Sequence, residues 1–384
     1  MKPMNRKGFV LLMLFGGCAA FPLPAAACSI PVFRYALERW APDFYEVAVF
    51  YRGALSAEDR RRLDGLEERS LRNDGAANLD VAACNLDGKV PSDLAQLWES
   101  LGDVPLPHAV VRMPLGRGRP HAVWNGPLAE LTPEMLVDSP KRREACKRLL
   151  AGDSIVWLLV GDKKANAIEK ARILLIDLLP KLADDIPLPE GVGLPGSELA
   201  SRVPLAVKFS VVEVDPADPA EIWLLRTLES VAPKNHQLGE PLVAALFGRG
   251  RVVDVFPAGD IEETLVADVS RFLCGACSCQ VKQQNPGFDL LTSTRWEREL
   301  FEEGFEDPSN RGDAALAADA PAVLVPIPSS KRRLDDSVAT TGAPQTRAAE
   351  SSNDADLTAF WFQCAVVGLG LITLTWVASH TRRS

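Results

Sequence analysis

The sequence has little histidine and lacks several motifs that mark common enzyme classes. Four of its 384 residues are histidine, at positions 108, 121, 236 and 380. Catalytic zinc sites normally use histidine ligands, so this scarcity argues against one. The chain also contains no Gly-x-Ser-x-Gly, no Walker loop and no His-Glu-x-x-His. We therefore expect no bound cofactor and favour a protein that is not an enzyme.

Basic residues are outnumbered by acidic ones, 42 Lys and Arg against 51 Asp and Glu, and the formal net charge is −9. Nucleic-acid binding proteins need a basic surface to contact phosphates, so we expect no nucleic-acid partner. Apolar residues make up 47% of the chain and charged residues 24%. These values are typical of a globular protein with a hydrophobic core.

The first 27 residues have the three parts of a secretory signal peptide. Lys2, Arg6 and Lys7 precede the apolar run Gly8–Phe15, and the small residues 25–27 suit a cleavage site. Cleavage there makes Cys28 the first residue of the mature chain. Lipid attachment at Cys28, or at Cys18, is left open by the sequence.

The other end of the chain predicts a membrane anchor. Residues 357–378 form 22 residues without a charge, long enough for a transmembrane helix. The tail, 379–384, carries Arg382 and Arg383, and basic residues favour the cytoplasmic side. We therefore expect a single-pass membrane protein with a cytoplasmic tail and an extracytoplasmic body, periplasmic in a two-membrane cell.

Residues 306–356 are rich in Ala, Asp, Ser, Thr, Pro and Gly and show no sustained helical or strand period. This composition predicts a flexible linker between the body and the membrane. Its one apolar patch is 320–328 (APAVLVPIP), which could dock on the body as an extended segment.

The body contains two halves with the same order of predicted elements. In the first half the strands are 45–51, 79–86, 108–113 and 121–125, and the helices are 56–71, 92–101 and 139–150. In the second half the strands are 154–160, 205–214, 242–247 and 251–256, and the helices are 163–182, 219–231 and 261–273. Both halves read β-α-β-α-β-β-α, which predicts an α/β protein with two domains, 28–152 and 153–305.

In each half a proline opens the third strand, Pro107 in the first and Pro241 in the second, and a Gly-Arg-Gly turn follows that strand. This order resembles the thioredoxin fold, in which a cis-proline precedes the third strand beside the active site. The resemblance implies two tandem thioredoxin-like domains. Thioredoxins carry Cys-x-x-Cys after the first strand, where this chain has 51–54 (YRGA) and 161–164 (GDKK). The usual dithiol is therefore missing from both halves.

A narrower resemblance rests on two segments, 28–40 (CSIPVFRYALERW) and 277–291 (CSCQVKQQNPGFDLL). Both are similar to segments of an uncharacterised family of exported planctomycete proteins. That resemblance implies export and brings no activity with it.

The densest group of cysteines is Cys274, Cys277 and Cys279. A structural disulfide, with Cys28 as one candidate partner, is the interpretation that we favour in an oxidising compartment. A redox-active dithiol and a site for Cu(I) or zinc are the alternatives, because paired thiolates suit both. Cys277 and Cys279 are thus the candidate catalytic residues, and all three are candidate metal ligands.

Two weaker constellations remain. His108 and His121 flank the first hairpin and could face each other as ligands, although a structural role is the simpler interpretation. The Gly-Arg-Gly turns could bind an anion, but glycine at these positions is what a tight hairpin needs. We favour a membrane-anchored binding or assembly module that engages a membrane-associated protein. A thiol-disulfide oxidoreductase or a copper-handling protein is the alternative.

Overall fold

The computed structural model describes residues 29–115, 119–195, 197–276 and 282–303. By its internal contacts the chain divides into two units, Met1–Ser330 and Lys331–Ser384, and every described residue belongs to the first. The predicted signal peptide, linker and transmembrane helix lie outside the described residues. Among the residues that are described, no helix has the length and apolar content needed to cross a membrane.

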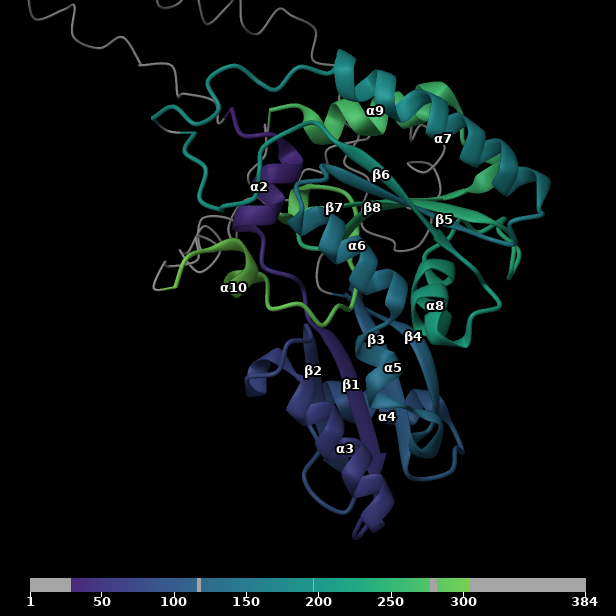
Figure 1. Cartoon of the computed structure of the whole chain (residues 1–384). Helices are drawn as coiled ribbons and strands as arrows, with labels where there is room; N and C mark the ends of the chain where they lie inside the picture. The colour runs from purple at the N-terminus through teal and green to yellow at the C-terminus, as the bar shows by residue number, and fades with distance from the viewer. Residues whose placement is uncertain (1–28, 116–118, 196, 277–281, 304–384) are drawn as a thin grey trace, which may run out of the picture. The chain divides into compact units, whose positions relative to one another are not determined.

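The first sheet has four strands in the order β2-β1-β3-β4 (Figure 1). Their bounds are β1 Tyr45–Tyr51, β2 Leu79–Asn85, β3 His108–Leu115 and β4 Arg119–Pro127. β1 runs parallel to β2 and antiparallel to β3, which pairs antiparallel with β4. All four strands were predicted, because Val-rich and aromatic runs are separated by turn residues.

The second sheet repeats this order and adds a strand: β6-β5-β7-β8-β9. The bounds are β5 Ile155–Val160, β6 Phe209–Val214, β7 Leu242–Phe247, β8 Arg251–Pro257 and β9 Phe288–Asp289. β9 was not expected, because a two-residue strand has no sequence period. It pairs antiparallel with β8, with Asp289 opposite Arg251 and Phe288 opposite Val252.

The helices also follow the predicted order, except that α5 is an additional helix that was not predicted. The first half contains α3 Ala57–Arg69, α4 Ser92–Leu101, α5 Pro133–Val137 and α6 Pro140–Leu150, and the second half contains α7 Asn166–Asp185, α8 Ile222–Ser230 and α9 Glu263–Cys274. The start of α3 is set by its cap: the Ser56 side chain accepts a hydrogen bond from the Asp59 N–H at 3.1 Å. The mixed α/β class is thereby confirmed, with two sheets consistent with thioredoxin-like domains.

One helix near the N-terminus packs against an element far from it in sequence. α2, Val32–Arg39, belongs to the same hydrophobic cluster as the strands of the second sheet. The Trp40 ring contacts Phe247 edge-on at 6.3 Å, and a Cβ on Gly248 would lie 2.7 Å from the Ala36 Cβ. The division at residue 152 therefore separates α2 from the sheet that it covers.

The two sheets also share a core. One hydrophobic cluster includes Val47 and Leu63 of the first half together with Val156 and Leu242 of the second. A separate, smaller cluster lies between β1, β2, β3 and α4 and includes Phe50. The two halves therefore bury apolar surface against each other, which a purely tandem arrangement would leave exposed to water.

Candidate functional site

The loop after β1, which the thioredoxin resemblance places at the active site, holds an ion pair where thioredoxins have thiols. Asp87 accepts hydrogen bonds from the Gly53 N–H at 2.8 Å and from Arg52 Nη1 at 2.9 Å. These two donors, the Gly53 N–H first, lower the pKa of the exposed Asp87 carboxyl. The loop after β1 is thus organised by Asp87 and presents the exposed residues Arg52, Gly53 and Ala54.

The proline beside this loop has the geometry that the thioredoxin resemblance implies. The Leu106–Pro107 peptide bond is cis, and the Pro107 carbonyl accepts from the Leu128 N–H at 3.0 Å. The N–H and C=O of Leu106 make no hydrogen bond to any described residue. In the second half the Pro241 carbonyl accepts from the Ala258 N–H at 2.8 Å.

The second half departs from the resemblance at this point. The only cis bond among the described residues is the one before Pro107, so the Glu240–Pro241 bond is trans. A Cβ on Gly161, at the end of β5, would lie 3.1 Å from the Pro241 Cβ. The two halves are therefore not equivalent, and the first keeps the geometry of the proline loop.

His108 and His121 do not face each other. In the β3–β4 register His108 lies opposite Pro127, while His121 lies opposite Met113, five residues further along β3. His108 Nε2 is 3.3 Å from the Asn125 Oδ1, and His121 Nε2 is 3.0 Å from the Ser230 carbonyl oxygen. The hypothesis of a ligand pair is wrong, because sequence spacing did not reveal the register. Nor do the described residues contain a group of three His, Cys, Asp or Glu that could hold a metal.

The described cysteines are free and buried: Cys84, Cys146 and Cys274. Burial raises the pKa of the Cys274 thiol to about 12, and a hydrogen bond with Ser154 offsets only part of this. Burial likewise raises the pKa of Cys146 to about 11 and that of Cys84. Because the thiolate is the reactive form, these three thiols are poor nucleophiles near neutral pH.

The remaining members of the predicted cysteine group, Cys28, Cys277 and Cys279, lie outside the described residues, so the disulfide, redox and metal readings of the group stay predictions. The described backbone beside them is informative. The Val32 N–H donates to the Gly275 carbonyl at 3.0 Å, and Pro31 forms an antiparallel bridge with Ala276. The segment that contains Pro31 and Val32 therefore runs next to the segment that leads into the group.

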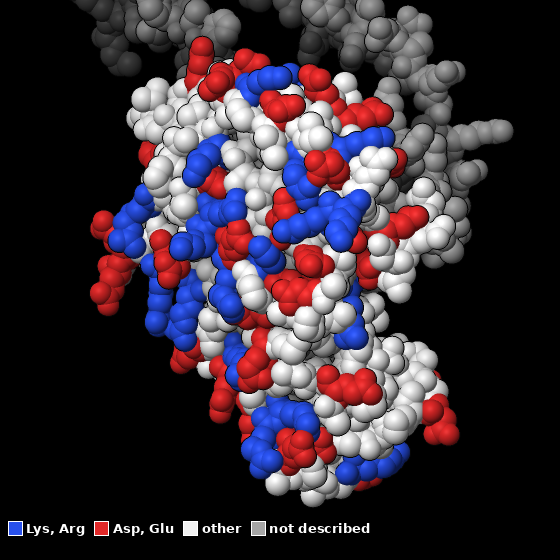
Figure 2. Space-filling view, turned by 45° about the vertical axis from the view of Figure 1, so that its right-hand side comes forward, with Lys and Arg blue, Asp and Glu red and all other residues white. Residues whose placement is uncertain are grey.

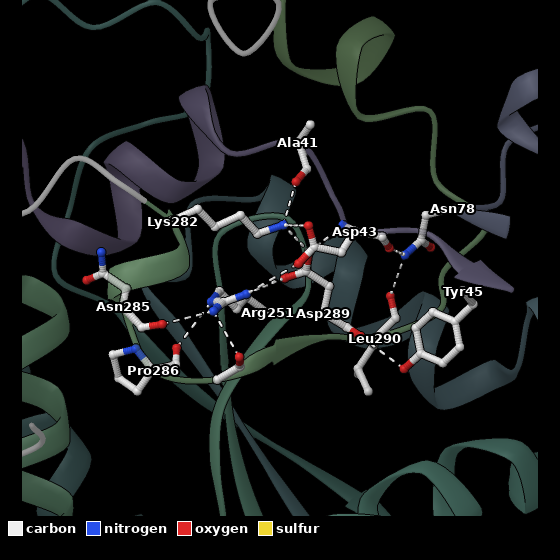
Figure 3. Close-up of polar contacts among 11 residues, drawn as sticks. Ala41, Asp43, Tyr45, Asn78, Arg251, Lys282, Asn285, Pro286, Asp289 and Leu290 are labelled. Atoms are coloured by element: carbon white, nitrogen blue, oxygen red, sulfur yellow. Dashed lines mark hydrogen bonds and ion pairs between the residues drawn. The ribbon is translucent and has the colours of Figure 1, made fainter. Parts of the chain in front are cut away.

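The most concentrated polar arrangement among the described residues is one that sequence reasoning missed. We call Asp43, Arg251, Lys282 and Asp289 the Asp289 cluster (Figure 3). Asp289 lies between the two cations: its Oδ1 is 3.1 Å from Arg251 Nη1, and its Oδ2 accepts from Lys282 Nζ. Lys282 also bridges to Asp43 Oδ1 at 3.0 Å and donates to the Ala41 carbonyl at 2.6 Å.

The charges of this cluster balance, with two carboxylates and two cations. Burial alone would raise the pKa of Asp289, but Lys282 and Arg251 outweigh it and hold that pKa below its ordinary value. Burial and the neighbouring Asp289 charge raise the pKa of Asp43, whose side chain is 42% exposed. No sequence pattern could have revealed the cluster, because Asp43 and Arg251 lie far in sequence from each other and from the segment that carries Lys282 and Asp289.

Two further buried polar residues join the first half to the C-terminal segment. The Asn78 side chain donates to the carbonyls of Asp43 at 2.8 Å and Leu290 at 3.1 Å, and accepts from the Thr292 N–H at 2.8 Å. Arg142 donates to the Leu291 carbonyl at 2.8 Å. Its burial lowers its pKa to about 10, so it stays charged at neutral pH. These contacts and the Asp289 cluster form a structural junction.

The second Gly-Arg-Gly turn also serves this junction. Arg249 donates to the carbonyls of Leu37 at 2.8 Å and Glu38 at 3.1 Å at the end of α2, and Arg251 enters the Asp289 cluster. The guanidinium groups of Arg249 and Arg251 therefore donate hydrogen bonds to buried groups within the protein. On the face seen in Figure 2, Lys and Arg side chains are interspersed with Asp and Glu and form no continuous field of one sign.

Comparisons with known proteins give one distant structural similarity. No family model matches the chain, and no curated protein matches its sequence. Among solved structures, the first two thioredoxin domains of Eps1p from Saccharomyces cerevisiae match at 13% identity and a TM-score of 0.19, over 60% of this chain and 88% of that one. A match at this level carries no argument about activity. The relation to exported planctomycete proteins stays a prediction.

Proposed function

We propose that this chain is a membrane-anchored extracytoplasmic binding module whose thioredoxin-like body holds an extended segment of a partner protein. The partner that we expect is itself membrane-associated. The proposal draws on the sequence signals at both ends, 1–27 for export and 357–378 for anchoring. It draws equally on the absence of a dithiol from positions 51–54 and 161–164.

The observation that carries the proposal is the main chain of Leu106. Its N–H and C=O have no hydrogen-bond partner among the described residues, although it directly precedes the cis-proline. Phe50 in β1 pairs with His108 in β3. Arg52 follows Phe50 by two residues and Leu106 precedes His108 by two residues, so both lie at the same end of the sheet. Free main-chain groups on an ordered segment suit an extended peptide, which pairs with them as an added strand does.

The chemistry of the described thiols supports binding over disulfide exchange. A redox thiol needs a lowered pKa and access to its substrate. Cys84, Cys146 and Cys274 have raised pKa values and are buried. The oxidoreductase and copper-handling alternatives therefore rest on Cys277 and Cys279 alone.

The proposal is tested by site-specific photo-crosslinking of the full-length protein in its native membranes. A photoreactive residue replaces Arg52, whose side chain is 59% exposed, and the matched control replaces Glu58, which is 67% exposed at the start of α3. We expect an adduct with one protein from position 52 and little from position 58. An amide-to-ester replacement of the Leu106 N–H should reduce the yield several-fold.

Equal adduct yields from positions 52 and 58 would contradict a binding site at this loop. The enzymatic alternative has its own readout, reduction of a model disulfide substrate by the purified protein. Measurable turnover that is lost in Cys277→Ser or Cys279→Ser would move the oxidoreductase function to first place.

A further inference from the structure

The outer edge of β2 has open main-chain groups. The Tyr45 N–H donates to the Asn78 carbonyl at 2.9 Å, and the Leu86 N–H donates to the Tyr51 carbonyl at 2.8 Å. Alternate residues of a strand point their N–H and C=O to opposite sides, so the even-numbered residues of β2 face β1 and the odd-numbered ones face outward. Val81 and Ala83 therefore present their main-chain groups at the edge of the sheet.

This opening is bounded on both sides. Just before it, the Leu79 carbonyl accepts from the Ser70 hydroxyl at 2.5 Å. Just after it, the Asn85 carbonyl accepts from the Gly88 N–H at 3.0 Å. Among the described residues nothing pairs with the outward groups of Val81 and Ala83. The open edge is thus two outward-facing residues long.

Other sheet edges are protected, as edges in soluble proteins usually are. On β6, Arg148 Nη1 donates to the Val211 carbonyl at 3.0 Å. β9 is only two residues long. On β4 the Trp124 ring packs edge-on against Trp223 of α8 at 5.5 Å. By contrast, residues 81–84 (VAAC) contain no charge, proline or glycine, so the open part of the β2 edge carries none of the features that prevent strand addition; the charged residue of β2, Asp80, lies before it and pairs with Arg72.

The side chains at this edge are incompletely covered. Val81 and Ala82 are half-buried and Ala83 is exposed, whereas Val47 and Ala48, which pair with Val81 and Ala82 in β1, are fully buried. An apolar strand added beside β2 would remove this surface from water, and the gain in free energy grows with the apolar area covered.

The chain itself carries a segment suited to this edge. Residues 322–325 (AVLV) form an apolar run with two valines between Glu303 and the predicted span, and Pro321 and Pro326 flank them; the other apolar run there, 314–318 (AALAA), has no β-branched residue. Valine and leucine suit a strand, and proline has no N–H, so pairing ends at both flanks. A short strand that cannot extend matches an edge that is open over two outward residues.

The connecting chain is long enough. Nineteen residues lead from Glu303 to Ala322, and at about 3.4 Å per residue they span at most roughly 60 Å. A globular body of about 275 residues has a radius of gyration near 19 Å and hence a diameter of about 50 Å. Residues 322–325 can therefore reach most of the surface of the body, and Ser293, near the start of the connecting chain, is bridged to Ala77, two residues before β2.

We propose that residues 322–325 add to β2 as a fifth strand of the first sheet. Docking shortens the free part of the linker to about 30 residues. The root-mean-square span between body and membrane falls from about 40 Å to about 30 Å. Strand addition thus sets how far the body works from the membrane, independently of what binds at Leu106.

Amide hydrogen exchange of the full-length protein in detergent tests this proposal. The double variant Val323→Pro and Leu324→Pro removes one N–H group on each edge of the added strand. Val338→Pro with Ala339→Pro is the matched control in the same linker. We expect the Val81 and Ala83 amides to exchange at least tenfold faster in the first variant and unchanged in the control. The Ala48 amide, inside the sheet, reports that the fold is intact.

Two results would overturn the proposal. One is equal exchange of the Val81 and Ala83 amides in wild type and in the Val323→Pro, Leu324→Pro variant. The other is protection of these amides that rises with protein concentration, because a second copy would then occupy the edge. Ala83→Pro provides a reciprocal check, since edge strands tolerate proline. It should raise the exchange of the 323–325 amides by a similar factor.

Discussion

Replacing Asp289 with Asn should destabilise the protein strongly, because it removes the negative charge that lies between two buried cations. The side chain keeps almost the same shape, so the loss of stability reports the loss of charge. The Asp289 side chain is 3% exposed and is the shared partner of Arg251 and Lys282, which are 6% and 9% exposed. After Asp289→Asn the cluster carries one net positive charge. The remaining counter-ion is Asp43, whose side chain is 42% exposed and therefore screened by water.

The expected loss can be given a magnitude. Breaking a buried ion pair by removing one partner costs about 3–5 kcal/mol, because it leaves an uncompensated buried charge. For a body of this size, 1 kcal/mol corresponds to about 2–4 °C in Tm, so the melting temperature should fall by roughly 6–20 °C. Removing Lys282 as well, by Lys282→Met, restores neutrality and should recover about 2 kcal/mol.

Thermal and urea unfolding of the purified protein, followed by circular dichroism, measure these changes. Arg60→Gln is the matched control, because Arg60 and Asp64 are 3.9 Å apart and half-exposed, and such a surface pair is worth less than about 1 kcal/mol. The reasoning is refuted if Asp289→Asn costs no more than the control. It is also refuted if the double variant loses the full sum of the two single losses.

Three further predictions follow from the same structure and sequence. Asp289 has a lowered pKa when folded, so its stabilising contribution is complete above the unfolded pKa of about 3.9 and is lost as the pH falls through the folded value. Between pH 4 and pH 2 the Tm of wild type should therefore fall more steeply than that of Asp289→Asn. Alkylation of native protein at pH 7.5 should leave Cys84, Cys146 and Cys274 unmodified for hours. Peptide mapping without reductant should find Cys28 joined to Cys277 or Cys279, and rapid labelling of Cys277 or Cys279 would contradict this disulfide. An alkaline phosphatase fusion after Phe305 should be active and one after Ser384 inactive, and activity from the second alone would exclude the predicted orientation.

The order and type of the main elements could be predicted from the sequence, because they depend on local patterns. Runs of aliphatic and aromatic residues marked β1, β5 and β7, the Ser56 cap marked the start of α3, and Pro107 marked the start of β3. The missing dithiol was also visible, since it requires only that position 51–54 be read against the predicted strand and helix. Each of these inferences uses residues within about ten positions of one another.

The junction between the halves was decided by tertiary structure alone. Asp43, Arg251, Lys282 and Asp289 are ordinary charged residues in sequence, and only the packing of three distant parts of the chain, around positions 43, 251 and 282–289, brings them together. The same is true of α2, whose apolar face gives no sign of which sheet it will cover. Periodicity specifies which face of an element is buried, whereas the partner of that face depends on contacts hundreds of residues apart.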